Sequence, residues 1–175
     1  MRTLHLLRHA KSSWDDSAIP DRKRPLAPRG RRDAKRIAKH LLQLEIQPEL
    51  VLCSSAARTR ETLELVRVAL GKRSNARVED ELYGATAEQL LERLRLVSAA
   101  TASALLIGHN PGLQDLALLL ASGGVGLDRL EEKLPTAALA TLTLERTAWS
   151  ELGPGAAVLS AYVVPKELRH ESESG

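Results

Sequence analysis

The chain has almost no aromatic residues and only one cysteine. Its 175 residues include no Phe, 2 Trp and 2 Tyr, although 43% of them are hydrophobic. The core must therefore be built from Leu, Val, Ile and Ala, and rows of aromatic side chains that stack on single-stranded nucleic acid are excluded. The single cysteine, Cys53, excludes a disulfide within the chain and fits a reducing compartment.

Long apolar runs and a strong net charge are lacking as well. No stretch approaches the ~20 apolar residues of a membrane helix, and charged residues directly after the first apolar run argue against a signal peptide. We therefore expect a cytoplasmic protein with no membrane partner. The net charge is only +3. Basic residues cluster at 22–32, but a solvated helix face near an anionic substrate explains them as well as a nucleic-acid patch does, so we expect no nucleic-acid partner.

Strand-like and helix-like patterns alternate along the chain, which predicts an α/β fold with a mostly parallel sheet. Apolar runs predict strands at 3–8, 50–53 and 104–107, with a short extended segment at 76–78. Helical spacing of apolar residues predicts helices over 28–44, 57–70, 86–97 and 111–120. A flexible connection at 123–126 leads to two more strands, 138–144 and 157–164, where we expect some antiparallel pairing. We expect one domain over residues 1–165 and a charged, frayed tail over 166–175.

Histidine side chains follow two of the predicted strands. Arg8 and His9 come directly after the first strand, and His109 follows the strand at 104–107. Ligands bind at the carboxyl ends of strands in open α/β sheets. An imidazole there can attack phosphorus if one ring nitrogen is unprotonated, and a backbone carbonyl bonded to the other nitrogen would fix that tautomer. The competing explanation is that both histidines only stabilise turns.

Arg58 lies just beyond the strand at 50–53, at the start of a predicted helix. A guanidinium group binds phosphate oxygens in a bidentate manner, and a helix N-terminus favours an anion. Surface ion pairs with Glu61 or Glu64 are the alternative. Cys53 and Arg58 are one residue too close for the C-x₅-R loop of tyrosine phosphatases, so we expect Cys53 to be a small strand residue. Metal-ligand pairs such as H-x-x-x-H or C-x-x-C are missing, so we expect no metal.

Four segments together resemble the histidine phosphatase superfamily. Residues 7–10 (LRHA) are similar to its Arg-His signature, 24–30 (RPLAPRG) to its RPLTxxG segment, 54–62 (SSAARTRET) to its second arginine motif and 108–110 (GHN) to its second histidine motif. All four occur in the order of that family. The short chain and the sequence RHAKS at 8–12 most resemble the SixA-like phosphohistidine phosphatases.

The resemblance implies a three-layer α/β/α sandwich that needs neither a metal nor another cofactor. It makes His9 the catalytic nucleophile and places Arg8, Arg58 and His109 around the bound phosphate. Ala27 stands where the family usually has Thr, which should weaken a helix cap by ~1 kcal/mol without affecting the chemistry.

The identity of the general acid stays open in the sequence. Larger relatives place a Glu a few residues before a Gly, and both Asp80 and Glu81 precede Gly84. We take Glu81 as the candidate acid, with Asp80 or no acid as the alternatives. An imidazole leaves more easily than an alkoxide, so a weak or absent acid would favour phosphohistidine over phosphate esters.

These features predict a phosphohydrolase that acts on phosphohistidine in a protein, such as a histidine phosphotransfer domain, through phospho-His9. The first alternative is a phosphomonoesterase for a small phosphorylated metabolite. A short chain is expected to have an open pocket, which suits a phosphate on a protein better than a buried metabolite. The short chain also has little sequence to enclose the second phosphate site of a mutase. The second alternative is a non-catalytic module that binds phosphorylated ligands, although binding alone does not require a nucleophile.

Overall fold

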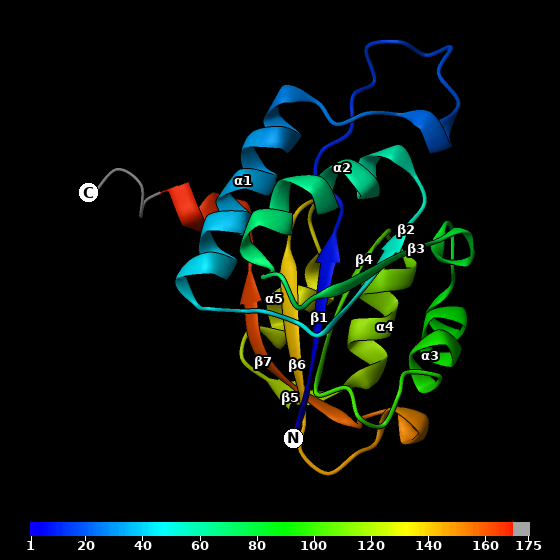
Figure 1. Cartoon of the computed structure of the whole chain (residues 1–175), viewed down its shortest axis with the longest axis vertical. Coiled ribbons are helices and arrows are strands. Elements are labelled where there is room, and N and C mark those ends of the chain that lie inside the picture. Colours follow the sequence, from blue (N-terminus) through cyan, green and yellow to red (C-terminus); the bar gives the residue numbers. More distant parts are fainter. Residues whose placement is uncertain (170–175) are drawn as a thin grey trace.

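The protein contains one mixed sheet of seven strands in the order β3-β2-β4-β1-β6-β7-β5 (Figure 1). The computed structural model describes residues 1–169. The strands are β1 (Arg2–Arg8), β2 (Leu50–Ser54), β3 (Asn75–Glu79), β4 (Ser103–Gly108), β5 (Ala121–Gly124), β6 (Leu139–Leu144) and β7 (Ala157–Val163).

Most neighbouring strands run in the same direction. β1 pairs in parallel with β4, and β2 pairs in parallel with both β4 and β3. β6 is antiparallel to β1 and to β7, while β5 is parallel to β7. Within the described residues β6 is therefore the strand that runs against the others, which confirms a mostly parallel sheet with antiparallel pairing near the C-terminus.

Helices cover both faces of the sheet, as the three-layer expectation required. α1 (Pro28–Gln43), α2 (Ala57–Val66) and the 3₁₀ segment η5 (Pro165–Arg169) pack on one face. α3 (Ala87–Arg95), α4 (Gly112–Leu120) and α5 (Leu127–Glu132) pack on the other. Leu, Ile, Val and Ala fill most of both core layers, as the lack of Phe predicts. Among the helices of residues 1–169, none is both long enough and apolar enough to cross a membrane.

The caps and turns agree with the sequence at several points. Thr86 caps α3 in a capping box with Gln89. Ala27 precedes α1 without a side-chain cap, as its methyl group requires. Gly71 (φ +80°) lies in the left-handed region that favours glycine, although α2 ends earlier than predicted and a 3₁₀ turn, η2 (Arg67–Ala69), fills the interval.

Two predictions in the C-terminal third are wrong, and one short helix was not predicted. Residues 121–124 form the edge strand β5, where we expected a flexible connection from 123. α5 follows, although six residues are too few for a clear helical period. Residues 166–169, which we expected to be frayed, belong to η5, and Leu168 is buried, while the domain boundary at residue 165 stays a prediction. The rest of the predicted tail, 170–175, lies outside the described residues.

Candidate active site

Three neighbouring parallel strands end at one edge of the sheet and bring the candidate residues together. β1, β4 and β2 lie side by side, with Arg8 opposite Gly108 and Cys53 opposite Ile107. His9, His109 and Ser54 therefore lie at the same edge. We call these three residues, together with Arg8, the floor of the site; His9 and Ser54 are buried, and Arg8 and His109 are half-buried. In Figure 1 this edge is at the top, where the arrow of β1 points toward the loop of residues 10–27.

His9 has the tautomer that a nucleophile needs. Its Nδ1 lies 2.7 Å from the carbonyl oxygen of Ala10. Because a carbonyl oxygen only accepts, Nδ1 carries the proton and Nε2 keeps its lone pair. The side chain is buried, and burial, reinforced by the positive charges nearby, lowers the pKa of His9 to about 3. The imidazole is therefore neutral at physiological pH.

The backbone around His9 is held from two sides. The His9 N–H donates to the carbonyl oxygen of Gly108, 3.1 Å away. The N–H of Ala137 donates to the carbonyl oxygens of both Arg8 and His9, at 3.1 and 3.0 Å. Ala137 has a φ of 59°, a conformation that costs a non-glycine residue of order 1 kcal/mol or more. This strained residue fixes the direction in which His9 leaves the strand.

His109 lies beside His9, with 5.3 Å between the ring centroids. Its Nε2 is 2.7 Å from Ser54 Oγ, which also accepts the Ala56 N–H at 3.4 Å. When Ser54 donates its hydroxyl hydrogen to Nε2, the proton of the neutral ring is on Nδ1. That Nδ1 is buried and has no partner within residues 1–169, so it is a donor ready for an anion. Burial lowers the pKa of His109 to about 4.

Two guanidinium groups complete the anion-binding cluster. Arg8 donates through Nη1 to the carbonyl oxygen of Leu134, 3.0 Å away, while its buried Nε has no partner in the described part of the chain. Arg58 lies close enough for its charge to lower the pKa values of Arg8, His9 and His109. Arg8, Arg58 and His109 Nδ1 thus supply three donor groups that favour a bound anion.

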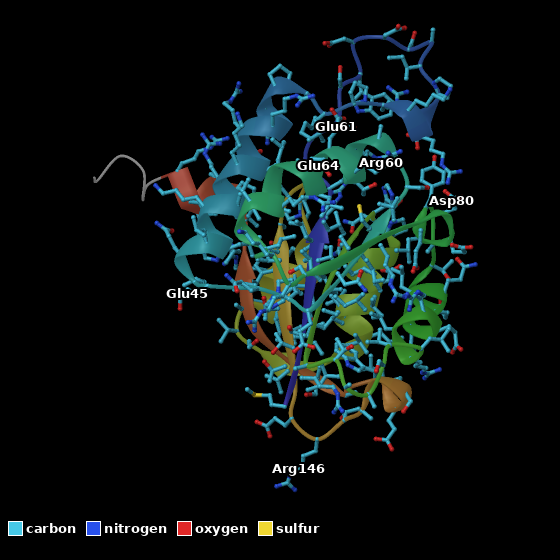
Figure 2. All side chains as sticks on the ribbon, in the orientation of Figure 1. Glu45, Arg60, Glu61, Glu64, Asp80 and Arg146 are labelled. Carbon is cyan, nitrogen blue, oxygen red and sulfur yellow. The ribbon has the colours of Figure 1, made fainter. Side chains whose placement is uncertain are left out.

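Arg58 contacts neither of the acidic residues that the sequence suggested for it. Its Nη1 donates to the backbone oxygen of Asp21 at 2.8 Å, and its Nη2 lies 3.1 Å from Asp21 Oδ2. Glu61 instead binds Arg31 and accepts the N–H of Leu26. Figure 2 labels Glu61 and Glu64 on α2, together with the neighbouring Arg60.

Other residues of the family-like segments hold the loops in place. Thr62 Oγ1 accepts the Ala10 N–H at 3.0 Å and donates to the carbonyl oxygen of Arg58 at 2.7 Å, so it joins α2 to the end of β1. A Cβ atom on Gly30 would lie 2.1 Å from the backbone oxygen of Lys11, which explains why this close approach requires glycine.

A second, exposed group of residues borders the floor, and we call Asp21, Arg22, Asp80 and Tyr83 the rim. Asp21 and Arg22 come from η1 (Asp21–Lys23), while Asp80 begins η3 (Asp80–Leu82). Arg22 donates to Asp80 Oδ1 at 2.6 Å, and the Tyr83 hydroxyl donates to Asp21 Oδ2 at 2.6 Å. The Tyr83 ring stands edge-on to His109, with 5.6 Å between centroids. Figure 2 labels Asp80 on this side of the molecule, whereas Arg146 lies at the opposite end.

The structure does not bring Glu81 into either group. Glu81 is exposed on η3, and its charge acts on Arg93 of α3 rather than on His9 or His109. Asp80 reaches the rim but is paired with Arg22. The role of either residue as general acid stays a prediction.

The structure also bears on the roles of Cys53 and of possible metal ligands. Cys53 is fully buried, and burial raises the pKa of its thiol to about 12, so it is not a nucleophile at physiological pH. Groups of three or more His, Cys, Asp or Glu side chains that could hold a metal ion do not occur among residues 1–169.

Sequence reasoning missed Ser54, Asp21 and Tyr83. Ser54 lies in the second arginine motif, and its strand-end position next to His109 was the available signal. Asp21 and Tyr83 come from loops whose paths no periodic pattern predicts, so only the fold brings them together.

Comparison with known proteins agrees with this geometry. Residues 4–95 match the family model described as histidine phosphatase superfamily (branch 1). An uncharacterized protein of Mycobacterium tuberculosis is 36% identical over 164 residues, which cover 91% of this chain and all of that protein. The chain belongs to the histidine phosphatase superfamily and is a phosphatase enzyme.

Within that superfamily the chain is SixA-like. A structure assigned as the phosphohistidine phosphatase SixA from Nakamurella multipartitia has a TM-score of 0.77 and 32% identity, and covers 94% of this chain and 96% of its own. The protein histidine phosphatase SixA complexed with tungstate has a TM-score of 0.77 and 27% identity, with 95% and 99% coverage.

Proposed function

We propose that the protein removes the phosphoryl group from phosphohistidine on another protein, through a phosphohistidine intermediate at His9. The tautomer of His9 is the observation that carries this proposal. Its Nδ1 is bonded to the Ala10 carbonyl, so a free Nε2 lone pair lies beside Arg8, Arg58 and His109. An unprotonated nitrogen among anion-binding groups fits attack on a phosphoryl group.

The reaction has two steps. In the first, Nε2 of His9 forms a bond to phosphorus as the bond to the leaving group breaks, and the leaving group takes the bonding electron pair. Arg8, Arg58 and His109 Nδ1 hold the equatorial oxygens and stabilise their charge. In the second step, water attacks phospho-His9, inorganic phosphate is released, and the water proton passes to phosphate or solvent. These side chains supply the charge stabilisation, so the reaction needs no metal ion.

The surroundings of the floor favour phosphohistidine over a phosphate ester. An alkoxide must receive a proton as it leaves, but Asp80 is paired with Arg22 and Glu81 is exposed away from the floor. An imidazole leaves more readily. The similarity to SixA proteins supports the same substrate class. A histidine phosphotransfer domain is the partner we propose, and the cytoplasm is the compartment we propose, because Cys53 is a reduced thiol in a chain that cannot form an internal disulfide.

Phosphate release from two substrates tests the proposal. Wild type and His9→Ala are incubated in EDTA with a phosphohistidine-bearing protein and with p-nitrophenyl phosphate. We expect release from the phosphoprotein by wild type alone. A strong preference for the ester would instead support a small-molecule phosphatase, and no release from either substrate would support a binding module. If Glu81→Gln and Asp80→Asn both leave unchanged the hydrolysis of an alkyl phosphate, whose alkoxide must receive a proton, neither residue is the acid.

A further inference from the structure

Asp21 is the carboxylate that contacts the anion-binding cluster most directly. One of its oxygens, Oδ2, receives hydrogen bonds from the Tyr83 hydroxyl at 2.6 Å and from Arg58 Nη2 at 3.1 Å. Its backbone oxygen receives Arg58 Nη1 at 2.8 Å. The side chain is 50% exposed, so it reaches both Arg58 and the solvent side of the site.

The position of Asp21 matches the side on which a leaving group departs. Phosphoryl transfer places the attacking and leaving atoms on opposite sides of phosphorus. His9 is on the floor, with only 7% of its surface exposed, whereas Asp21 lies on the rim against the same Arg58. Tyr83 connects the two levels, because its ring packs edge-on against His109 while its hydroxyl binds Asp21. A leaving group opposite His9 therefore departs toward Asp21 and Tyr83.

On the basis of the function proposed above, we propose that Asp21, held by Tyr83, determines specificity by accepting a hydrogen bond from the imidazole of the substrate phosphohistidine. The accepted N–H belongs to the ring nitrogen that is not bonded to phosphorus. When both nitrogens are substituted, the ring is cationic. As the P–N bond breaks, its electron pair stays on nitrogen and the ring leaves as neutral imidazole, so this step requires no proton transfer.

An ionised Asp21 can accept a hydrogen bond from the substrate, but it cannot act as a general acid. The hydrogen bond from Tyr83 lowers the pKa of Asp21 the most; burial opposes it, and Arg58 and Arg24 lower the pKa further. Asp21 is thus a carboxylate at neutral pH, and an opposite charge favours the protonated form of a nearby imidazole. A carboxylate cannot give a proton to an alkoxide, so the same residue offers nothing to an ester substrate.

The test compares two substrates that differ in their leaving groups. Phosphoimidazole needs a protonated ring, whereas p-nitrophenyl phosphate releases p-nitrophenolate without a proton. We expect Asp21→Asn to lower kcat/KM for phosphoimidazole about tenfold, the equivalent of one pKa unit of the substrate ring. It should change kcat/KM for p-nitrophenyl phosphate by less than about threefold, since Asn keeps the shape of the side chain. Asp15→Asn, which removes an exposed carboxylate of the same loop, is the matched control and should change neither rate.

A pH profile separates this role from simple positioning of Arg58. The deficit of Asp21→Asn on phosphoimidazole should shrink as the pH falls, because solvent then protonates the substrate ring. The charged and titratable groups that act on Asp21 are Arg58, Arg24, Tyr83 and His109. Equal losses on both substrates, or a gain on both, would overturn the proposal. If wild type releases no phosphate from either substrate in a His9-dependent manner, the proposed function itself fails and this inference fails with it.

Discussion

The floor and the rim of the site are built in opposite ways. The floor consists of buried and half-buried side chains at strand ends, and Arg8 and His9 are held by hydrogen bonds to backbone carbonyl oxygens. The rim consists of mostly exposed side chains on the short 3₁₀ segments η1 and η3 and just after η3, and its contacts are pairs of side chains such as Arg22–Asp80 and Tyr83–Asp21. Exposed ion pairs contribute little to stability, whereas buried hydrogen bonds are costly to break.

This difference suggests that the floor carries out phosphoryl transfer and that the rim determines which substrate is preferred. The floor holds donors and a nucleophile in fixed positions, which phosphoryl transfer to any substrate requires. The rim borders the side from which substrate arrives and the leaving group departs. Changes on the floor should therefore lower activity toward every substrate, while changes on the rim should alter the preference between substrates.

Loss of the nucleophile should have the largest effect. We expect His9→Ala to lower kcat toward both substrates by more than about a thousandfold, because no other group of the floor replaces the covalent step. Phosphate release in EDTA measures this. His40→Asn, on the outer helix α1, is the control and should keep full activity. Comparable turnover by His9→Ala would contradict the two-step mechanism.

Loss of the guanidinium group that joins floor and rim should come next. We expect Arg58→Lys to lower kcat/KM by about 100-fold on both substrates, because lysine keeps the charge but cannot bind the phosphate in a bidentate manner. The matched control is Arg60→Lys, two residues further along the same helix. If the two variants lose activity to the same extent, the assignment of Arg58 to the phosphate is wrong.

Ser54 should give a smaller effect through His109. We expect Ser54→Ala to lower kcat by about tenfold, the equivalent of about one hydrogen bond, because His109 then loses the group that places its proton on Nδ1. Ser54→Thr keeps the hydroxyl and should retain most of the activity. Steady-state kinetics on both substrates measure the change, with thermal unfolding as a check on folding. Equal rates for wild type and Ser54→Ala would show that the hydrogen bond from Ser54 to His109 does not contribute to catalysis.

The smallest effect concerns stability rather than turnover. Burial lowers the pKa of His5 to about 4, and His9 and His109 are lowered to about 3 and 4. Unfolded histidines titrate near 6.5, so below that pH the unfolded chain binds more protons and the free energy of unfolding falls. Each histidine contributes a slope of about 1.4 kcal/mol per pH unit between pH 6.5 and its folded pKa, and nothing above pH 6.5.

His5→Asn isolates one of these contributions. His5 lies in β1, where its Nδ1 is 2.9 Å from Oγ1 of Thr141 on the neighbouring strand β6. Urea unfolding of wild type and His5→Asn between pH 7 and 4 should show a shallower decline for the variant, with activity at pH 7 retained. Parallel curves would mean that His5 titrates alike in both states.

The sequence predicts the floor better than the rim for a physical reason. Apolar runs ending in Arg8, His9 or His109 place those residues at strand ends, and parallel strands share one edge. Asp21 and Tyr83 meet through loops, where neither period nor propensity determines the path. β5 was missed for a similar reason. Its glycine-rich sequence is typical of a connecting loop, and it is a strand because it pairs with β7.

The phosphoenzyme itself gives the most direct test of the central claim. Wild-type protein is mixed with a phosphohistidine-bearing protein in EDTA, quenched in alkali within the first turnover, and analysed by peptide mass spectrometry. The account predicts an alkali-stable, acid-labile phosphoryl group on His9 that is absent from His9→Ala. Phosphate release without any phosphorylated His9, or with the phosphoryl group on another residue, would contradict it.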